Sequence, residues 1–343
     1  MFCHYNPFNH RNNSEGTGID SLELVDAPRP GALGAGQIRV AVRAASINYR
    51  DTLMLDNAYV RPPAGLIPCS DGSGEVIEVA PDVTRVKQGS RVALTYNPDW
   101  IGGAYRASSG PAGLGRGALL PGVMQEEMVV HQSEAVVLPD HLNFVEGAAY
   151  PCAGVTAWHA LCGPTPLLPG SVILTQGSDG VSLFALQFAK LFGARVVATT
   201  SSPERAAKLR ELGADETIDY RADPDWDKRV RELTGGTGAD MTIEIGGAET
   251  FARSLASTRT GGRVAVIGLL TGRSGGGAPI TASVDIHMMR AGSRADHEDM
   301  YRAVAFHQSQ PVIDTVYGFD DLPKALHHLK TGEHIGKIAV SFN

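Results

Sequence analysis

Strands and helices alternate along the chain from residue 156 onward, and this alternation constrains the fold more than any other feature of the sequence. Short apolar runs are separated by amphipathic stretches such as Val181–Phe192, whose apolar side chains recur at helical spacing. The strands are predicted over residues 171–176, 195–200, 216–220, 240–245 and 263–268. Because parallel strands need crossover connections, this series predicts a mostly parallel, doubly wound α/β sheet.

The first half of the chain follows a different pattern, in which short strands are interrupted by glycine and proline. These strands are predicted over residues 37–45, 74–79, 90–95 and 127–131. Many short strands with turn residues between them are typical of a compact β-barrel-type domain. The stretch from about residue 300 to 343 holds a predicted helix and a final strand, and we expect it to return and complete this first domain.

Length and composition limit the classes of protein that the chain can belong to. Its 343 residues are enough for two domains, each with a sizeable core. With 30 Lys and Arg against 37 Asp and Glu, and no basic block, nucleic-acid binding is disfavoured. The sequence has no apolar run of roughly 20 residues and no cationic-then-apolar leader, and its four cysteines have no paired spacing. We therefore expect a cytoplasmic protein that acts on a small molecule, without a nucleic-acid or membrane partner.

The first strand–helix turn of the second half has the composition of a phosphate-binding loop. It reads QGSDGVS over residues 176–182, after a predicted strand and before a predicted helix. Glycines there let the backbone approach a dinucleotide pyrophosphate, and the helix N-terminus offers unpaired N–H groups. The residues expected to bind the cofactor here are Gly177, Ser178, Gly180 and Val181. Asp179 adds a carboxylate close to the expected pyrophosphate, a like-charge cost unless it points to solvent or caps the helix; a tight turn without a ligand remains the alternative.

The end of the second strand indicates which dinucleotide would bind. An NAD site usually has Asp or Glu at this position, where it bonds the ribose 2′-hydroxyl. Here the strand ends in TTSS over residues 199–202, and Arg205 follows one turn into the next helix. Hydroxyl groups and a guanidinium suit a 2′-phosphate, so Ser201 and Arg205 favour NADP(H). Alternatively, Arg205 is a solvated helix residue paired with Glu204 or Glu211.

Several segments, in order along the chain, resemble those of one enzyme family. They are residues 45–51 (ASINYRD), 67–76 (IPCSDGSGEV), 138–140 (LPD), 151–158 (PCAGVTAW) and 336–337 (GK). From about residue 20 to its end the chain resembles the medium-chain dehydrogenase/reductases, and within them the zinc-independent, quinone-oxidoreductase-like branch. The resemblance implies a GroES-like catalytic domain over residues 1–155, completed by about 300–343, a Rossmann dinucleotide-binding domain over 156–299, and an active site in the cleft between them.

The resemblance also lets the family's zinc sites be tested position by position. Zinc members of the family use Cys, His and Cys, and the matching residues here are Asn48, Ser70 and Cys152. One soft ligand of three does not hold a catalytic Zn²⁺. The structural zinc lobe needs four close cysteines, and no cysteine lies between Cys69 and Cys152. The sequence therefore predicts that neither metal is bound.

Without a Lewis acid to activate an alcohol, the expected reaction is hydride transfer from NADPH to a quinone or an activated C=C bond. By resemblance, Tyr59 is the candidate donor to the developing oxyanion, Asn48 bonds the ribose or the substrate carbonyl, and Asp51 braces the loop. A half-buried structural role is the alternative for Tyr59. The resemblance places the remaining cofactor contacts at Thr156, Tyr220, Ile245, Gly246, Gly268 and Leu269.

Two departures from the family pattern qualify these expectations. The segment up to Gly18 is rich in Asn and His and lacks the usual opening strand. At Ala291–Gly292 an apolar strand that usually pairs across the family's dimer is missing, so the sheet is expected to be short by a strand and a homodimer is in doubt. A metal-independent alcohol/aldehyde oxidoreductase and a non-catalytic cofactor-binding relative therefore remain alternative functions.

Overall fold

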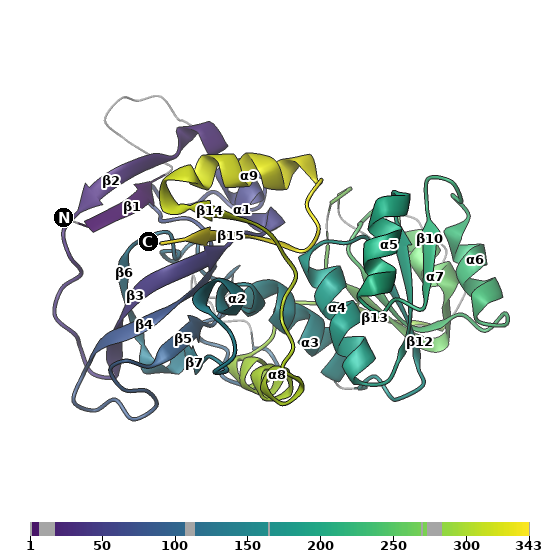
Figure 1. Cartoon of the computed structure of the whole chain (residues 1–343), viewed down its shortest axis with the longest axis horizontal. Helices are drawn as coiled ribbons and strands as arrows, with labels where there is room; N and C mark the ends of the chain where they lie inside the picture. Colours follow the sequence, from purple (N-terminus) through teal and green to yellow (C-terminus); the bar gives the residue numbers. More distant parts are fainter. Residues whose placement is uncertain are drawn as a thin grey trace. The chain divides into compact units, whose positions relative to one another are not determined.

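The structure is a computed structural model that describes residues 2–6, 18–106, 114–163, 165–268, 270–272 and 283–342. The chain divides into two compact units (Figure 1). The first comprises Met1–Val155 together with Ala291–Asn343, and the second comprises Thr156–Arg290.

The first unit is built on a mainly antiparallel sheet in the order β14-β15-β3-β4-β5-β7, with β6 also paired to β3. Its strands are β3 (Gln37–Ser46), β4 (Asp71–Val79), β5 (Arg91–Leu94), β6 (Glu127–His131), β7 (Ala135–Val137), β14 (Ile313–Gly318) and β15 (Lys337–Ser341). Strand β15 pairs antiparallel with β3, placing Ala339 opposite Ser46 and Val340 opposite Ala45. The C-terminal segment is therefore part of the sheet formed by the first third of the chain.

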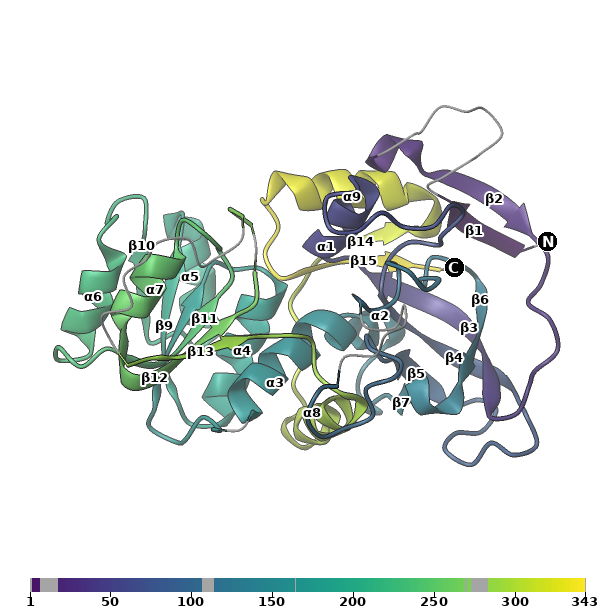
Figure 2. The same ribbon diagram turned by 180° about the vertical axis from the view of Figure 1, so that it is seen from behind.

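Helices of the same unit pack against this sheet. They are α1 (Tyr49–Leu55), α2 (Phe144–Ala148), a π-helix (Tyr150–Gly154), α8 (Arg294–His307) and α9 (Leu322–Thr331). Helix α9 lies beside α1 in both views (Figures 1 and 2). Leu322, Ala325, Leu326 and Leu329 of α9 face the core at the i, i+3, i+4, i+7 spacing of an amphipathic helix.

The N-terminal segment contains a strand that the sequence analysis did not expect. Strand β1 (Phe2–Asn6) pairs antiparallel with β2 (Glu23–Ala27), with Phe2 opposite Ala27 and Asn6 opposite Glu23. The expectation that this segment lacks an opening strand is therefore wrong. A two-stranded ribbon depends on backbone hydrogen bonds, so it forms without the valine- and isoleucine-rich composition by which strands are predicted.

The second unit confirms the prediction of a doubly wound parallel sheet. All strand pairs in it are parallel, in the order β10-β9-β8-β11-β12-β13. The strands are β8 (Val172–Gln176), β9 (Arg195–Thr200), β10 (Glu216–Asp219), β11 (Ala239–Glu244), β12 (Thr258–Val266) and β13 (Asp285–Met288). Its helices are α3 (Val155–Cys162), α4 (Gly180–Leu191), α5 (Pro203–Glu211), α6 (Trp226–Leu233) and α7 (Phe251–Ser257). Helices α4 and α5 cover one face of this sheet, and α6 and α7 cover the other (Figures 1 and 2).

Strand β13 corrects the expectation of a missing strand. Asp285–Met288 runs parallel to β12, with Val264 opposite Ile286 and Val266 opposite Met288. Among the described residues the sheet therefore has six strands, in the order 3-2-1-4-5-6 that is typical of dinucleotide-binding folds. The strand was not predicted because DIHM alternates polar and apolar residues, as a strand at a sheet edge does, unlike the apolar runs of central strands.

No helix in the part of the chain that the structure describes is long and apolar enough to cross a membrane.

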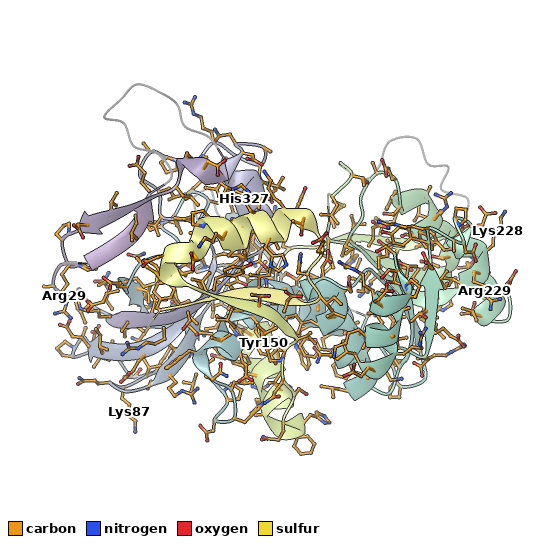
Figure 3. All side chains as sticks on the ribbon, turned by 45° about the horizontal axis from the view of Figure 1, so that its top comes forward. Arg29, Lys87, Tyr150, Lys228, Arg229 and His327 are labelled. Atoms are coloured by element: carbon orange, nitrogen blue, oxygen red, sulfur yellow. The ribbon has the colours of Figure 1, made fainter. Side chains whose placement is uncertain are left out.

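A buried histidine, His297, lies on α8. His297 is 1% exposed, its ring centroid lies 4.5 Å from that of Tyr301, and neither ring nitrogen has a partner among the described residues. Tyr301 in turn packs edge-on against Tyr150, and both residues are buried; Tyr150 is labelled in Figure 3. Burial lowers the pKa of His297 from 6.5 to about 3. The native state therefore holds a neutral imidazole at any pH above this value.

This histidine predicts a loss of stability in mild acid. Between pH 6.5 and about 3 the unfolded chain binds a proton at His297 that the native state does not, so the free energy of unfolding decreases as the pH falls. Replacing His297 by Phe removes this contribution. We expect the variant to gain about 2 kcal/mol relative to the unsubstituted protein on going from pH 7.5 to pH 5. Urea unfolding at both pH values measures the difference, with exposed His307→Gln on the same helix as control, and parallel pH dependences of the variant and the unsubstituted protein would contradict the prediction.

Candidate functional site

The first group of candidate residues surrounds the start of α1, directly after β3. The Asp51 carboxylate accepts a hydrogen bond from the backbone N–H of Asn48 (Oδ2 to N, 2.8 Å). Asn48 is the N-cap of α1, and Asp51 is its third helical residue, a spacing that helices use to satisfy their first N–H groups. The four-residue segment Asn48–Asp51 thus has a local structural role at the start of α1.

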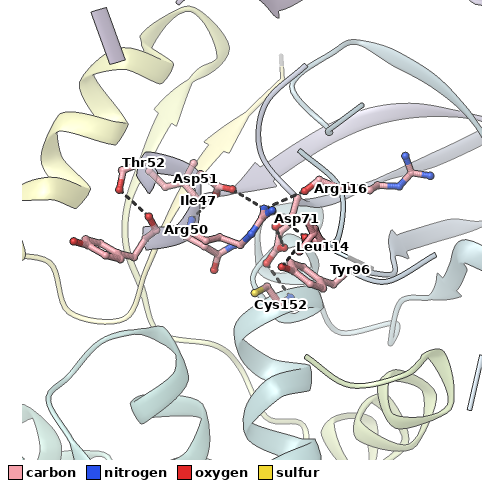
Figure 4. A network of polar contacts seen from close by, with 12 residues as sticks. Ile47, Arg50, Asp51, Thr52, Asp71, Tyr96, Leu114, Arg116 and Cys152 are labelled. Carbon is pink, nitrogen blue, oxygen red and sulfur yellow. Dashed lines mark hydrogen bonds and ion pairs between the residues drawn. The ribbon is translucent and has the colours of Figure 1, made fainter. Parts of the chain in front are cut away.

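A buried charge cluster lies around this helix start; it consists of Asn48, Arg50, Asp51, Asp71 and Lys337. Lys337 Nζ donates to Asn48 Oδ1 and to the Ile47 carbonyl, both at 2.6 Å. Arg50 Nη1 donates to Asp51 Oδ1 at 3.0 Å (Figure 4). Asp71, which is 0% exposed, accepts hydrogen bonds from the Ser70 hydroxyl (2.6 Å) and the Cys152 backbone N–H (3.0 Å). Two cations thus balance two carboxylates away from water.

Burial has a marked effect on the carboxyl groups of this cluster. Desolvation raises the pKa of Asp51 to about 6, while Arg50 acts in the opposite direction. Desolvation likewise raises the pKa of Asp71, and Lys337 opposes it most strongly. The two cations therefore favour the ionised form of both carboxyl groups, and removing either cation would leave a carboxylate without compensation.

Arg50 also connects the cluster to the segment after β5. Its guanidinium donates to the backbone carbonyls of Arg116 (3.0 Å) and Leu114 (3.2 Å) and lies 5.2 Å from the centroid of the Tyr96 ring (Figure 4). The Tyr96 hydroxyl donates to the same Leu114 carbonyl at 3.1 Å. Burial raises the pKa of Tyr96, and the phenol of Tyr59 adds to that shift electrostatically.

The three residues predicted to be catalytic differ in how accessible they are. Asn48 and Asp51 lie in the buried charge cluster, and Asn48 Oδ1 and both Asp51 oxygens accept hydrogen bonds from within the protein. Tyr59 is 46% exposed. Tyr59 is thus the member of the three whose side chain a bound molecule could reach most readily. Sequence reasoning missed Lys337, Arg50 and Tyr96, although the GK pair that contains Lys337 was among the segments that carry the family resemblance.

The residues at the family's zinc position do not fit a zinc ion. Asn48 Oδ1 accepts a hydrogen bond from Lys337, and the Ser70 hydroxyl donates to Asp71. Burial raises the pKa of the Cys152 thiol, which disfavours the thiolate that zinc needs. Within the described ranges, no three His, Cys, Asp or Glu side chains are arranged to hold a metal ion.

The second group of candidate residues lies at the carboxyl ends of the parallel strands, where ligands of open α/β sheets bind. After β8, Gly177 adopts a φ of 74°, a conformation that favours glycine, and Ser178 is buried. Asp179 is the N-cap of α4, which begins at Gly180. Arg205 Nη1, from the first turn of α5, donates to Ser178 Oγ at 2.7 Å. The structure therefore brings the predicted 2′-phosphate residue onto the predicted phosphate loop.

The loops after β11 and β12 are in close contact. A Cβ atom added at Gly268 would lie 1.7 Å from the Ile245 carbonyl oxygen, so only glycine fits there. Ile245 and Gly246 follow β11, Ser201 is half-buried after β9, and Tyr220 is 41% exposed after β10. These predicted residues share the carboxyl edge of the sheet with Val181, the second residue of α4. Thr156, in contrast, is buried within α3. Leu269 lies outside the described residues.

Comparison with known proteins identifies the family. Residues 34–140 match the model of the alcohol dehydrogenase GroES-like domain, and residues 180–309 match that of zinc-binding dehydrogenases. A zinc-type alcohol dehydrogenase-like protein of Schizosaccharomyces pombe is 32% identical over 343 residues, which cover 96% of this chain and 98% of the relative. The chain belongs to the medium-chain dehydrogenase/reductase family.

Other relatives agree with this membership. A quinone oxidoreductase of Pseudomonas aeruginosa is 34% identical over 301 residues, covering 84% of this chain and 83% of the relative. The crystal structure of a putative alcohol dehydrogenase from Sinorhizobium meliloti superimposes with a TM-score of 0.89 at 35% identity, covering 99% and 98% of the two chains. The chain is therefore an oxidoreductase of a family that uses a nicotinamide cofactor, with quinone-oxidoreductase-like and alcohol-dehydrogenase-like relatives, as the sequence resemblance implied.

Proposed function

We propose that this medium-chain dehydrogenase/reductase is a zinc-independent reductase that transfers a hydride from NADPH to quinones or activated C=C bonds. In this proposal the first unit is the catalytic domain and the second binds the dinucleotide. The observation that carries it is the arrangement at the family's zinc position, where Asn48 and Ser70 are engaged by Lys337 and Asp71. The described residues around this position therefore offer no set of zinc ligands. Reduction of an electrophilic acceptor does not depend on the Lewis acid that alcohol oxidation uses.

The phosphate loop supports NADPH as the cofactor. Gly177, Ser178 and the N-terminus of α4 would hold the pyrophosphate with backbone N–H groups. Arg205, held at Ser178, would pair with the 2′-phosphate. Among solved structures, a mycobacterial protein with 25% identity and a TM-score of 0.79 is complexed with NADPH, whereas one with 28% identity and a TM-score of 0.87 is a NAD-dependent alcohol dehydrogenase. Because these relatives differ, the choice of NADPH in this proposal is based on the position of Arg205 beside Ser178.

The bound nicotinamide supplies the hydride, and the protein must position the acceptor and provide a proton. The exposed phenol of Tyr59 is our candidate donor to the oxygen on which negative charge develops. Asn48 and Asp51 would hold the start of α1 in place through the contacts of the buried charge cluster. Thr156 would contact the nicotinamide from α3, while Ile245, Gly246 and Gly268 would border the cofactor at the strand ends.

A second candidate function follows from the alcohol-dehydrogenase-like relatives. A metal-independent alcohol/aldehyde oxidoreductase would reversibly oxidise an alcohol with NAD(P)⁺, and a chelator would not affect the reaction. NADPH oxidation by quinones or enones, without alcohol oxidation, would exclude it.

The direct test is a fluorescence titration of the purified protein with NADPH and with NADH. We expect saturable binding of NADPH and at least tenfold weaker binding of NADH, followed by NADPH consumption with quinones and enones at unchanged rates in the presence of a zinc chelator. Tighter binding of NADH would contradict the assignment of Arg205. Absence of binding by both would contradict the proposed reaction and support a non-catalytic relative.

Removing the charge of Asp179 is expected to increase the affinity for NADPH. Its carboxylate is half-buried at the N-cap of α4 and accepts no capping hydrogen bond, so it would repel the cofactor pyrophosphate. We expect Asp179→Asn to tighten NADPH binding about 5- to 10-fold at low salt, on the scale of helix-terminus charge effects. The gain should decrease at high ionic strength. Exposed Asp320→Asn, which changes the net charge equally, should leave the affinity unaltered; weaker binding by Asp179→Asn would contradict this reading of the loop.

A further inference from the structure

Two buried side chains end adjacent strands of the second unit. Gln176 is the last residue of β8 and Glu244 the last of β11, and these strands are paired in the sheet. Glu244 is 0% exposed, and Gln176 Nε2 donates to its Oε2 at 3.0 Å. The pair therefore forms a buried polar contact at the carboxyl edge of the sheet.

The carboxylate of Glu244 accepts hydrogen bonds on both oxygens. Its Oε1 accepts from the backbone N–H of Gly247 (2.8 Å) and the Thr250 hydroxyl (2.6 Å). Its Oε2 accepts from the Ser254 hydroxyl as well as from Gln176. Thr250 and Ser254 belong to the start of α7, so this carboxylate joins the end of β11 to the next helix.

The amide of Gln176 completes the arrangement. Its Oε1 accepts from the backbone N–H groups of Ile245 (3.2 Å) and Gly246 (3.3 Å). Three consecutive N–H groups of the loop after β11 are therefore bound by the side chains of Gln176 and Glu244. Buried backbone N–H groups need such partners, and here two side chains determine the path of the loop.

The loop after β11 in turn holds the loop after β12. The Thr271 N–H and hydroxyl both donate to the Gly246 carbonyl, at 2.8 and 3.0 Å. Gly268 lies directly against the Ile245 carbonyl. A change at Gln176 or Glu244 would therefore displace both strand-end loops together.

We propose that Gln176 and Glu244 are positioning residues that set the affinity of the second unit for its dinucleotide by fixing residues 245–247 after β11 and, through them, the described residues Gly268 and Thr271 after β12. This inference rests on the proposed function, in which those loops border the cofactor. Neither side chain needs to touch the cofactor, because both act through the backbone of residues 245–247.

The pattern of donors and acceptors predicts distinct effects for three variants. In Glu244→Gln an amide NH₂ group replaces one of the two carboxylate oxygens. Whichever oxygen it replaces, the NH₂ group then faces N–H or O–H donors, so the loop loses a hydrogen-bond acceptor. In Gln176→Glu two carboxylates lie side by side, and they share the site only when one is protonated. In the reciprocal exchange, Gln176→Glu with Glu244→Gln, one amide and one carboxylate again face each other, and every backbone N–H keeps an acceptor.

The test is NADPH titration of these variants alongside thermal unfolding. We expect Glu244→Gln to weaken binding at least tenfold and the reciprocal exchange to restore it to within about threefold. Raising the pH from 6 to 8 should weaken NADPH binding by Gln176→Glu. This loss of affinity should be at least tenfold larger than the change that the unsubstituted protein shows over the same pH range. Val230→Ala, which removes buried volume from the core of the same unit, should lower the melting temperature without changing the affinity.

Each outcome decides the inference. If Glu244→Gln does not fold, the reciprocal exchange and Thr250→Val, which removes one donor to Glu244, still measure the coupling. Unchanged affinity in the folded variants, or a loss that Val230→Ala reproduces at equal destabilisation, would overturn the positioning role while leaving the proposed function intact. Failure of the unsubstituted protein to bind NADPH or NADH would instead overturn the proposed function and the inference with it.

Discussion

Replacing Arg205 by alanine is expected to weaken NADPH binding about 10- to 100-fold and to change NADH binding by less than about threefold. The guanidinium is held at Ser178 Oγ at 2.7 Å, in the phosphate loop. Hydrogen bonds to charged groups contribute about 1.5–3 kcal/mol, which corresponds to this range of affinity. NADH lacks the 2′-phosphate, so it has no group that the lost guanidinium would bind.

A matched control lies on the same helix. Lys208 is one turn further along α5 and pairs with Glu211 at the surface, so Lys208→Ala removes an equal charge without affecting the phosphate loop. Affinities for both dinucleotides are measured by fluorescence at two salt concentrations, because screening weakens nonspecific charge effects. An equal loss of affinity for NADPH and NADH would indicate that Arg205 contacts the pyrophosphate instead of the 2′-phosphate. Unchanged affinity for both would show that Arg205 does not contact the dinucleotide.

The parallel sheet was predictable because its strands are buried on both faces. Strand β9 has the predicted bounds, Arg195–Thr200, since an apolar run between a helix end and a turn has one reasonable assignment. The topology also predicted that the loops at the carboxyl ends of the strands form the candidate ligand site, because ligands of open α/β sheets bind at that edge. Strands β1 and β13 were not predicted, because each contains both polar and apolar residues and is stabilised mainly by pairing with a neighbouring strand.

The polar contacts of the candidate sites were much less predictable than the fold. Lys337 and Asn48 are 289 positions apart in sequence, yet their side chains are 2.6 Å apart. Gln176 and Glu244 are the last residues of two strands that were both predicted. The contact between their side chains, however, depends on which strands are adjacent in the sheet. Local patterns carry periodicity and turn chemistry, whereas such contacts depend on the tertiary arrangement.

Replacing Lys337 by Met is expected to destabilise the first unit by about 3–5 kcal/mol, the usual cost of removing one partner from a buried ionic group. Lys337 is buried and donates to Asn48 Oδ1 and the Ile47 carbonyl, and its charge opposes the raised pKa of Asp71 and Asp51. Methionine matches the length of the side chain, so the loss reflects charge and hydrogen bonds more than packing. The start of α1 would also lose the contact that orients Asn48.

The pH dependence distinguishes this cause from a packing defect. Without Lys337 the pKa of Asp71 in the folded protein rises further above its pKa in the unfolded chain. The stability that the protonated Asp71 contributes is therefore present at low pH and is lost as the pH rises through the pKa of the folded protein. The deficit of Lys337→Met relative to the unsubstituted protein should therefore be larger at pH 8 than at pH 5. Adding Asp71→Asn should recover part of the deficit at pH 8, because no buried carboxylate is left without its cation. Urea unfolding of the single and double variants at both pH values measures these differences. A deficit independent of pH, with no recovery in the double variant, would show that Lys337 stabilises the unit through its hydrogen bonds and packing and not through its charge.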